Sequence, residues 1–69
     1  MNKFTRKLTD RQILILTKLS DGMSDGEIAT DLKLSVGSIR RYIDDMLKIF
    51  STRNRTSLAV QAIRSKVIK

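Results

Sequence analysis

Residues 24–50 read SDGEIATDLKLSVGSIRRYIDDMLKIF, and this stretch predicts two helices joined by a tight link. A glutamate follows Ser24 three residues later, the spacing of a capping box, in which two side chains satisfy backbone N–H groups at a helix start. Ser35 offers a second N-cap. We therefore expect helices over about 25–33 and 36–50, an arrangement typical of the helix-turn-helix motif.

The second of these helices has two distinct sides. At about 100° per residue, its apolar stripe consists of Ile39, Tyr42, Ile43, Met46 and Phe50. The opposite side carries Gly37, Arg41, Asp44 and Lys48, with Arg40 at its edge. One interpretation is an amphipathic helix that packs its apolar side into the core and exposes its polar side to solvent. The other is a helix whose start enters the major groove of DNA, where two adjacent arginines can reach guanine edges or phosphates.

Two further helix starts flank this pair. Thr9 begins a second capping box and predicts a helix over about 10–20, and Asn54 or Thr56 can cap a last helix over about 55–66. No segment of the sequence shows the sustained alternation of a strand. The expected fold class is all-α: a compact four-helix domain with a central helix-turn-helix.

The composition points to a binding protein. The chain has 69 residues, with 14 Lys and Arg against 7 Asp and Glu and a net charge of +7. This length allows one domain with one small core. Together with the expected helix-turn-helix, it predicts a single helix-turn-helix domain over 1–69, in which residues 1–7 form a basic N-terminal arm. The sequence has no His and no Cys, which removes the commonest general base, the cysteine nucleophile and the usual transition-metal ligands. We expect no enzyme, no catalytic residue, no metal and no cofactor, but a partner that is a polyanion.

The same sequence argues against a membrane protein. Its longest apolar run, residues 13–16, is far shorter than the roughly 20 residues of a membrane span. No apolar stretch follows the basic N-terminus as it would in a signal peptide. We expect a cytoplasmic protein with no membrane partner.

The positive charge is uneven along the chain. Residues 1–18 carry five cations and one acid, and residues 49–69 carry five cations and no acid. Residues 19–48 carry four cations and six acids. The pattern indicates two phosphate-binding ends around a central reading helix.

Short motifs in a fixed order carry a resemblance to a known family. They are LTDRQ (8–12), EIA (27–29), LKLS (32–35), SIR (38–40) and NRT (54–56). Together they resemble the LuxR/FixJ-type (GerE-like) DNA-binding domain of bacterial regulators, without a gap from Leu8 to about Ile63. The resemblance implies a four-helix domain whose third helix reads the major groove of double-stranded DNA.

The resemblance also implies which residues contact DNA. Base contacts fall on Arg40, Arg41 and Asp44. Phosphate contacts are expected from the cap region and from exposed cations: Ser35, Gly37, Ser38, Lys48 and Arg55. The Asp44 carboxylate can accept a hydrogen bond from cytosine N4, or it can pair with a neighbouring arginine.

The chain departs from the family pattern at several positions. Gly26 stands where relatives usually have a phosphate-contacting lysine, so one phosphate anchor is missing. Residues 49–52, Ile-Phe-Ser-Thr, replace the usual K-L-G-V and leave the shape of the turn after the third helix open.

The first helix carries two apolar residues where relatives usually have polar ones. If Ile15, Leu16 and Leu19 face the core, Ile13 lies roughly 110° and Leu14 roughly 150° from that face. One interpretation is packing at the end of the core. The other is a surface, formed by Ile13 and Leu14, that docks a protein partner.

The last helix has more apolar surface than one domain needs. Leu58 and Ala62 form one apolar side, and a second side consists of Ala59, Val60, Ile63 and Val67. A surface helix needs one apolar stripe, so the second side predicts another contact. Relatives dimerise through this helix. The resemblance therefore implies a homodimer that presents two third helices to half-sites about one helical turn apart.

The leading hypothesis is a sequence-specific, DNA-binding transcriptional regulator made of this domain alone. Because Met1 precedes the first motif by a few residues, we expect a complete protein; the alternative to a complete protein is a domain excised from a longer chain. The alternative is a small interaction module or antagonist that pairs with another regulator rather than acting mainly through DNA. A sigma-factor-like promoter reader would share the helix-turn-helix, but it would need a polymerase-binding region for which the sequence offers no candidate.

Overall fold

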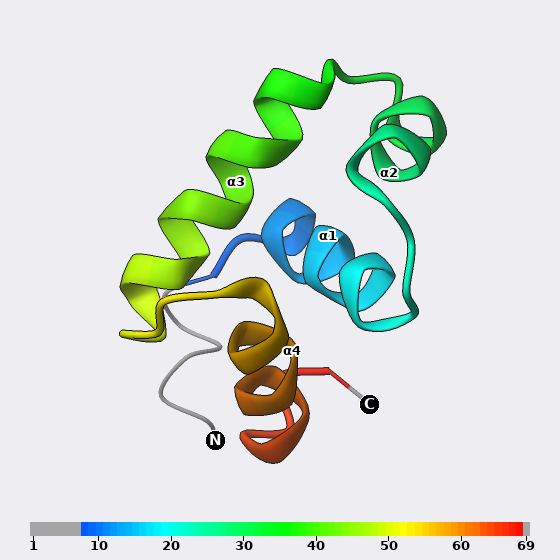
Figure 1. Cartoon of the computed structure of the whole chain (residues 1–69). Coiled ribbons are helices and arrows are strands. Elements are labelled where there is room, and N and C mark those ends of the chain that lie inside the picture. The colour runs from blue at the N-terminus through cyan, green and yellow to red at the C-terminus, as the bar shows by residue number, and fades with distance from the viewer. Residues whose placement is uncertain (1–7, 69) are drawn as a thin grey trace.

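The computed structural model describes residues 8–68 and forms four helices in this range (Figure 1). They are α1 (Asp10–Ser20), α2 (Asp25–Leu32), α3 (Val36–Ile49) and α4 (Arg55–Arg64). Residues 8–68 contain no strand, so the expected all-α class is confirmed. The basic arm predicted over residues 1–7 lies outside the described residues. None of the helices described is long and apolar enough to cross a lipid bilayer.

Each helix begins at a side-chain cap. The Thr9 hydroxyl accepts from the Gln12 N–H at 3.1 Å, and the Gln12 side chain accepts from the Thr9 N–H at 2.8 Å. Ser24 and Glu27 form the same reciprocal pair at the start of α2. The Asn54 carboxamide oxygen accepts from the Ser57 N–H at 2.8 Å and caps α4. The predicted capping boxes are confirmed, and Asn54 rather than Thr56 is the last cap.

All four helices end in the same hydrogen-bonded turn, the Schellman motif. A residue with positive φ donates its N–H to the carbonyl three residues earlier, and the next residue donates to the carbonyl five residues earlier. The positive-φ residues are Gly22 (89°), Lys33 (58°), Ser51 (53°) and Lys66 (61°). The turn after α3 thus closes in the usual way although a serine occupies its left-handed position. Three of the four turns hold a side chain where glycine is preferred.

The turn after α4 changes one prediction. The expected helix ran to residue 66, but α4 ends at Arg64 and the chain reverses at Lys66, with the Val67 N–H bonded to the Ala62 carbonyl at 3.1 Å. Val67 then packs against the core, and Ile68 is buried. Val67 therefore does not continue the outward apolar side of Ala59, Val60 and Ile63, because the helical periodicity stops before it.

The core lies around α1, which packs against each of the other three helices (Figure 1). Its fully buried members are Ile15, Leu16, Ile28, Ile39, Met46, Leu58 and Ala62. Because α1 has neighbours on several sides, its buried surface is wider than a single stripe. Ile13 packs against the core and is partly buried, whereas Leu14 is 44% exposed. The outward pair predicted on α1 is therefore reduced to Leu14.

Candidate nucleic-acid interface

The outer side of α3 is polar and exposed. Its inner side buries Ile39, Ile43 and Met46 with Phe50 just after the helix, and this packing fixes how the helix is rotated. The residues on the outer side are Gly37, Arg40, Arg41, Asp44, Asp45 and Lys48, and all six are exposed. Every residue that the sequence predicted for base contact lies on this side, as do Gly37 and Lys48 from the predicted phosphate contacts.

The first turn of α3 has features suited to an anion. The Ser35 hydroxyl accepts from the Ser38 N–H at 3.0 Å and donates to the Ser38 hydroxyl at 3.0 Å. The N–H groups of Val36 and Gly37 have no acceptor within the helix, since they belong to its first turn. A Cβ atom at Gly37 would meet only the Ser35 hydroxyl, at 3.9 Å, so packing does not require a glycine there. The bare backbone leaves these N–H groups open to a phosphate.

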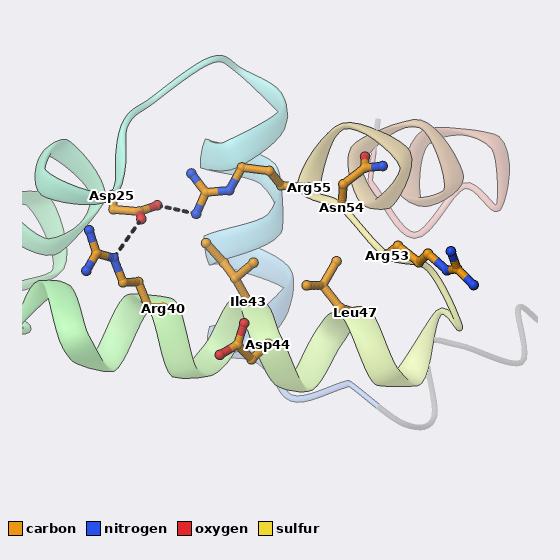
Figure 2. Close-up of a pocket in the computed structure, with 8 residues that line it drawn as sticks. All are labelled: Asp25, Arg40, Ile43, Asp44, Leu47, Arg53, Asn54 and Arg55. Atoms are coloured by element: carbon orange, nitrogen blue, oxygen red, sulfur yellow. Dashed lines mark hydrogen bonds and ion pairs between the residues drawn. The ribbon is translucent and has the colours of Figure 1, made fainter.

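A cluster of three charged side chains joins α2, α3 and α4 (Figure 2). Asp25, in the first turn of α2, contacts Arg40 of α3 through Oδ2, which lies 3.5 Å from the arginine Nε. Its Oδ1 accepts a hydrogen bond from Nη2 of Arg55, the first residue of α4, at 2.7 Å. Asp25 thus bridges one predicted base contact and one predicted phosphate contact.

Sequence reasoning did not assign a role to Asp25. Its position in a first turn is explained by the helix dipole alone, which favours an anion there. The only sequence signal is an acid in a chain with twice as many cations as acids. Neither arginine is near Asp25 in the sequence, so the cluster is created by the tertiary fold.

The cluster lies at one end of an open hollow of about 370 Å³ between α2, α3 and the start of α4. Arg40, Arg53 and Arg55 line this hollow together with Asp25 and Asp44. Figure 2 shows Arg53 at the other end of the hollow from Arg40, with its guanidinium directed away from Asp25. Arg53 is a further cation beside α3 that the motif comparison did not single out.

The acids around α3 differ in their surroundings. Asp44 and Asp45 have no ion-pair partner in the part of the chain that the structure describes, so the arginine pairing considered for Asp44 is not formed. Glu27 is exposed, and its hydrogen bonds from the Ser24 backbone and hydroxyl lower the pKa of its carboxyl. The lowered pKa keeps Glu27 ionised at the start of α2, where a negative charge is favourable.

The predicted dimer surface is partly apolar and exposed. Val60 is 42% and Ile63 is 50% exposed, and Ala59 is half-buried beside them. These residues line a shallow groove that also includes Leu19 and Met23 from the end of α1 and the turn after it. The groove lies on α4, apart from the outer side of α3.

Comparison with known proteins finds a family that matches most of the chain. Residues 6–62 match the luxR family of bacterial regulatory proteins, also described as GerE. A probable transcriptional regulator of Porphyra purpurea, ycf29, is 34% identical over 61 residues, which are 88% of this chain and 29% of that protein. The transcriptional regulatory protein LnrK of Bacillus subtilis is 30% identical over 57 residues, 83% of this chain and 26% of that protein. DesR of the same organism, also named a transcriptional regulatory protein, is 38% identical over 48 residues, 70% of this chain and 24% of that protein. The chain therefore spans about a quarter to three tenths of the length of these relatives.

Proposed function

We propose that this chain, which belongs to the luxR family of bacterial regulatory proteins, is a sequence-specific DNA-binding transcription regulator. The observation that carries the proposal is the exposed, cation-bearing outer side of α3, held by a helix-turn-helix whose inner side is buried. The named transcriptional regulators among its relatives support the same class. In this proposal the protein binds DNA and catalyses no reaction. It acts in the cytoplasm, where a bacterial chromosome lies.

In the proposed complex, α3 enters the major groove with its first turns nearest the bases. Arg41 faces directly away from the core, and Arg40 lies at the edge of the same side. Either guanidinium can donate two hydrogen bonds to O6 and N7 of a guanine. Asp44, which has no partner among residues 8–68, accepts from the N4 amino group of a cytosine.

Phosphates on either side of the groove would be held by different groups. The open N–H groups at the start of α3, with Ser35, Gly37 and Ser38, suit one phosphate. Lys48 at the far end of α3 and Arg55 at the start of α4 suit others. These contacts fix register and carry no sequence information.

A homodimer formed through α4 would present two copies of the proposed DNA-binding surface. Ala59, Val60 and Ile63 form the proposed contact, and Val67 is not part of it because it packs inside its own domain. Two domains related by a two-fold axis would then read half-sites about one helical turn apart.

Two features favour a second candidate function, an antagonist that pairs with another regulator. Gly26 offers no side chain where relatives usually have a lysine, and the outer side of α3 carries two acids, Asp44 and Asp45, that have no ion-pair partner among residues 8–68. Both features weaken attraction to phosphates. Leu14, exposed on α1, then provides a candidate contact for a protein partner.

A binding titration separates the two candidates. Duplexes selected from a randomised library by the protein, and a scrambled duplex of equal composition, are titrated by fluorescence anisotropy at several salt concentrations. A regulator shows a preferred duplex and an affinity that falls steeply with salt. An antagonist selects no consensus and binds both duplexes weakly and alike.

A further inference from the structure

We propose that Asp25 is a positioning residue for base reading, which holds Arg40 so that its terminal nitrogens are presented to a guanine. The inference rests on the proposed function, because it names the group that orients one of the reading side chains. Its basis is the bridge between α2, α3 and α4 (Figure 2).

The geometry of the Arg40 contact leaves the reading edge of the guanidinium free. Asp25 approaches Arg40 at Nε, 3.5 Å from Oδ2. Neither terminal nitrogen of Arg40 has a hydrogen-bond partner among residues 8–68, and its side chain is 70% exposed. Figure 2 shows these nitrogens on the side of the guanidinium away from Arg55. A guanidinium whose ion-pair contact is at Nε still has both terminal NH₂ groups free, and these can donate side by side to guanine O6 and N7.

Arg55 keeps the Asp25 carboxylate in place. It donates from Nη2 to Oδ1 at 2.7 Å, a charge-assisted hydrogen bond of normal length. The Asp25 side chain is only 15% exposed, and each of its oxygens faces a different arginine. Arg55 of α4 therefore orients the Asp25 carboxylate through Oδ1, and Oδ2 of the same carboxylate contacts Arg40 of α3.

Orientation matters because an unrestrained arginine has many alternatives. A long side chain on an exposed helix surface has several rotatable bonds, and near DNA it can reach a phosphate as easily as a base. A swing toward a phosphate would separate Arg40 from Asp25 and leave that carboxylate with one cation instead of two. Asp25 therefore disfavours the phosphate-bound conformer and leaves the base-directed one less costly to adopt.

The net charge of the cluster also indicates that Asp25 favours specific over general binding. Two arginines and one aspartate make a cluster with a net charge of +1, so Asp25 lowers the general attraction to DNA. A residue that reduces attraction to every sequence and improves contact with one sequence raises specificity. Specificity, more than affinity, is therefore the quantity that should change when Asp25 is replaced.

The test compares wild type with Asp25→Asn on two probes: the consensus duplex that wild type selects from a randomised library, and a scrambled duplex of equal composition. The lost orientation weakens binding to the consensus duplex about tenfold, the range of one good bidentate base contact. Binding to the scrambled duplex stays equal or strengthens, because one negative charge is removed. The ratio of the two affinities therefore falls about tenfold or more.

Three further variants make the result specific. Asp31→Asn removes the same charge from the same helix, at a residue whose ion pair is with Lys18 of α1, and it leaves the affinity ratio unchanged. Arg40→Ala lowers the ratio, and Asp25→Asn added to Arg40→Ala lowers it no further, because Asp25 acts through Arg40. Circular dichroism and thermal melting establish that each variant is folded. If Asp25→Asn is partly unfolded at the assay temperature, Asp25→Ser, which suits a helix start, takes its place.

The inference is overturned if Asp25→Asn keeps the wild-type affinity ratio, since Asp25 would then only join helices. It is equally overturned if the ratio falls by the same factor with Arg40 already replaced by alanine. A selection in which wild type yields no consensus duplex is a different failure: it contradicts the proposed function itself, and the inference with it.

Discussion

Asp25 and Arg55 lie thirty residues apart in the sequence, yet Oδ1 of the first is 2.7 Å from Nη2 of the second. The helices that carry them, α2 and α4, are not among the helix pairs that pack together. This ion pair therefore connects two elements that the core does not join directly.

The first prediction concerns how much the ion pair between Asp25 and Arg55 contributes to the free energy of unfolding. Replacing Arg55 with glutamine should lower the free energy of unfolding by no more than about 1 kcal/mol, because the Arg55 side chain is 46% exposed and such pairs are screened by water. The same change should weaken binding to the scrambled duplex, since Arg55 is proposed to hold a phosphate, and should weaken binding to the consensus duplex by a larger factor, since Arg55 also orients Asp25. Urea unfolding and anisotropy titration measure the two effects. A loss confined to the consensus duplex would contradict the phosphate assignment.

The second prediction separates two roles along α3. Arg41→Ala should cost about 1–3 kcal/mol of binding free energy on the consensus duplex and relax preference at one base pair. Lys48→Ala should weaken all duplexes about equally and reduce the salt dependence of binding. Both side chains are exposed on the same side of the helix, so neither change should disturb folding. Equal behaviour of the two variants in a library selection would show that Arg41 does not read a base.

The third prediction restores the missing anchor. A side chain at Gly26 has open space, since a Cβ there meets only the Ser24 hydroxyl at 3.9 Å. Gly26→Lys should therefore fold normally, raise affinity for every duplex and steepen the dependence of log affinity on log salt by about one ion. Gly26→Ala is the matched control, and it should leave the salt dependence unchanged. A salt dependence equal in both variants would place residue 26 away from phosphate.

The fourth prediction uses the left-handed turn after α3. Ser51 has φ 53°, a conformation that costs a residue with a Cβ atom more than glycine. Ser51→Gly should raise the free energy of unfolding by about 0.5–1 kcal/mol, because the gain exceeds the entropy that glycine adds to the unfolded chain. Ser57→Gly, inside the first turn of α4, should lower it instead. Thermal or urea unfolding measures both changes. A Ser51→Gly variant less stable than wild type would contradict the proposed cost of the left-handed serine.

The fifth prediction distinguishes two apolar residues near the C-terminus. Ile63 is 50% exposed, so Ile63→Glu should leave the fold stable and shift sedimentation toward the monomer at high protein concentration. Val67 packs against the core, so Val67→Glu should lower the free energy of unfolding by about 1–3 kcal/mol. If Ile63→Glu leaves the association of the wild type unchanged, or the wild type never associates with or without DNA, the proposed dimer surface is wrong.

Much of the fold could be predicted because its signals are local. A capping box needs only residues three apart, and the paired spacing at Thr9 and Ser24 located two helix starts correctly. The apolar stripe of α3 also follows from spacing within one helix, and it determined which side of α3 is exposed. The helix ends were less certain. Ser51 and Lys66 adopt left-handed turns that their residue types do not favour, and the early end of α4 placed Val67, partly buried, against the core instead of on the outward side of the helix.

The sequence by itself determined four capped helices, the polar, cation-bearing outer side of α3 and the order of motifs that identifies the family, because each depends on neighbours along the chain. Only the tertiary structure decided that Ile13 packs inward, since its burial depends on the several helices around α1. It alone also brought Asp25 to Arg40 and Arg55, because an ion pair between three helices depends on how the shared core orients them.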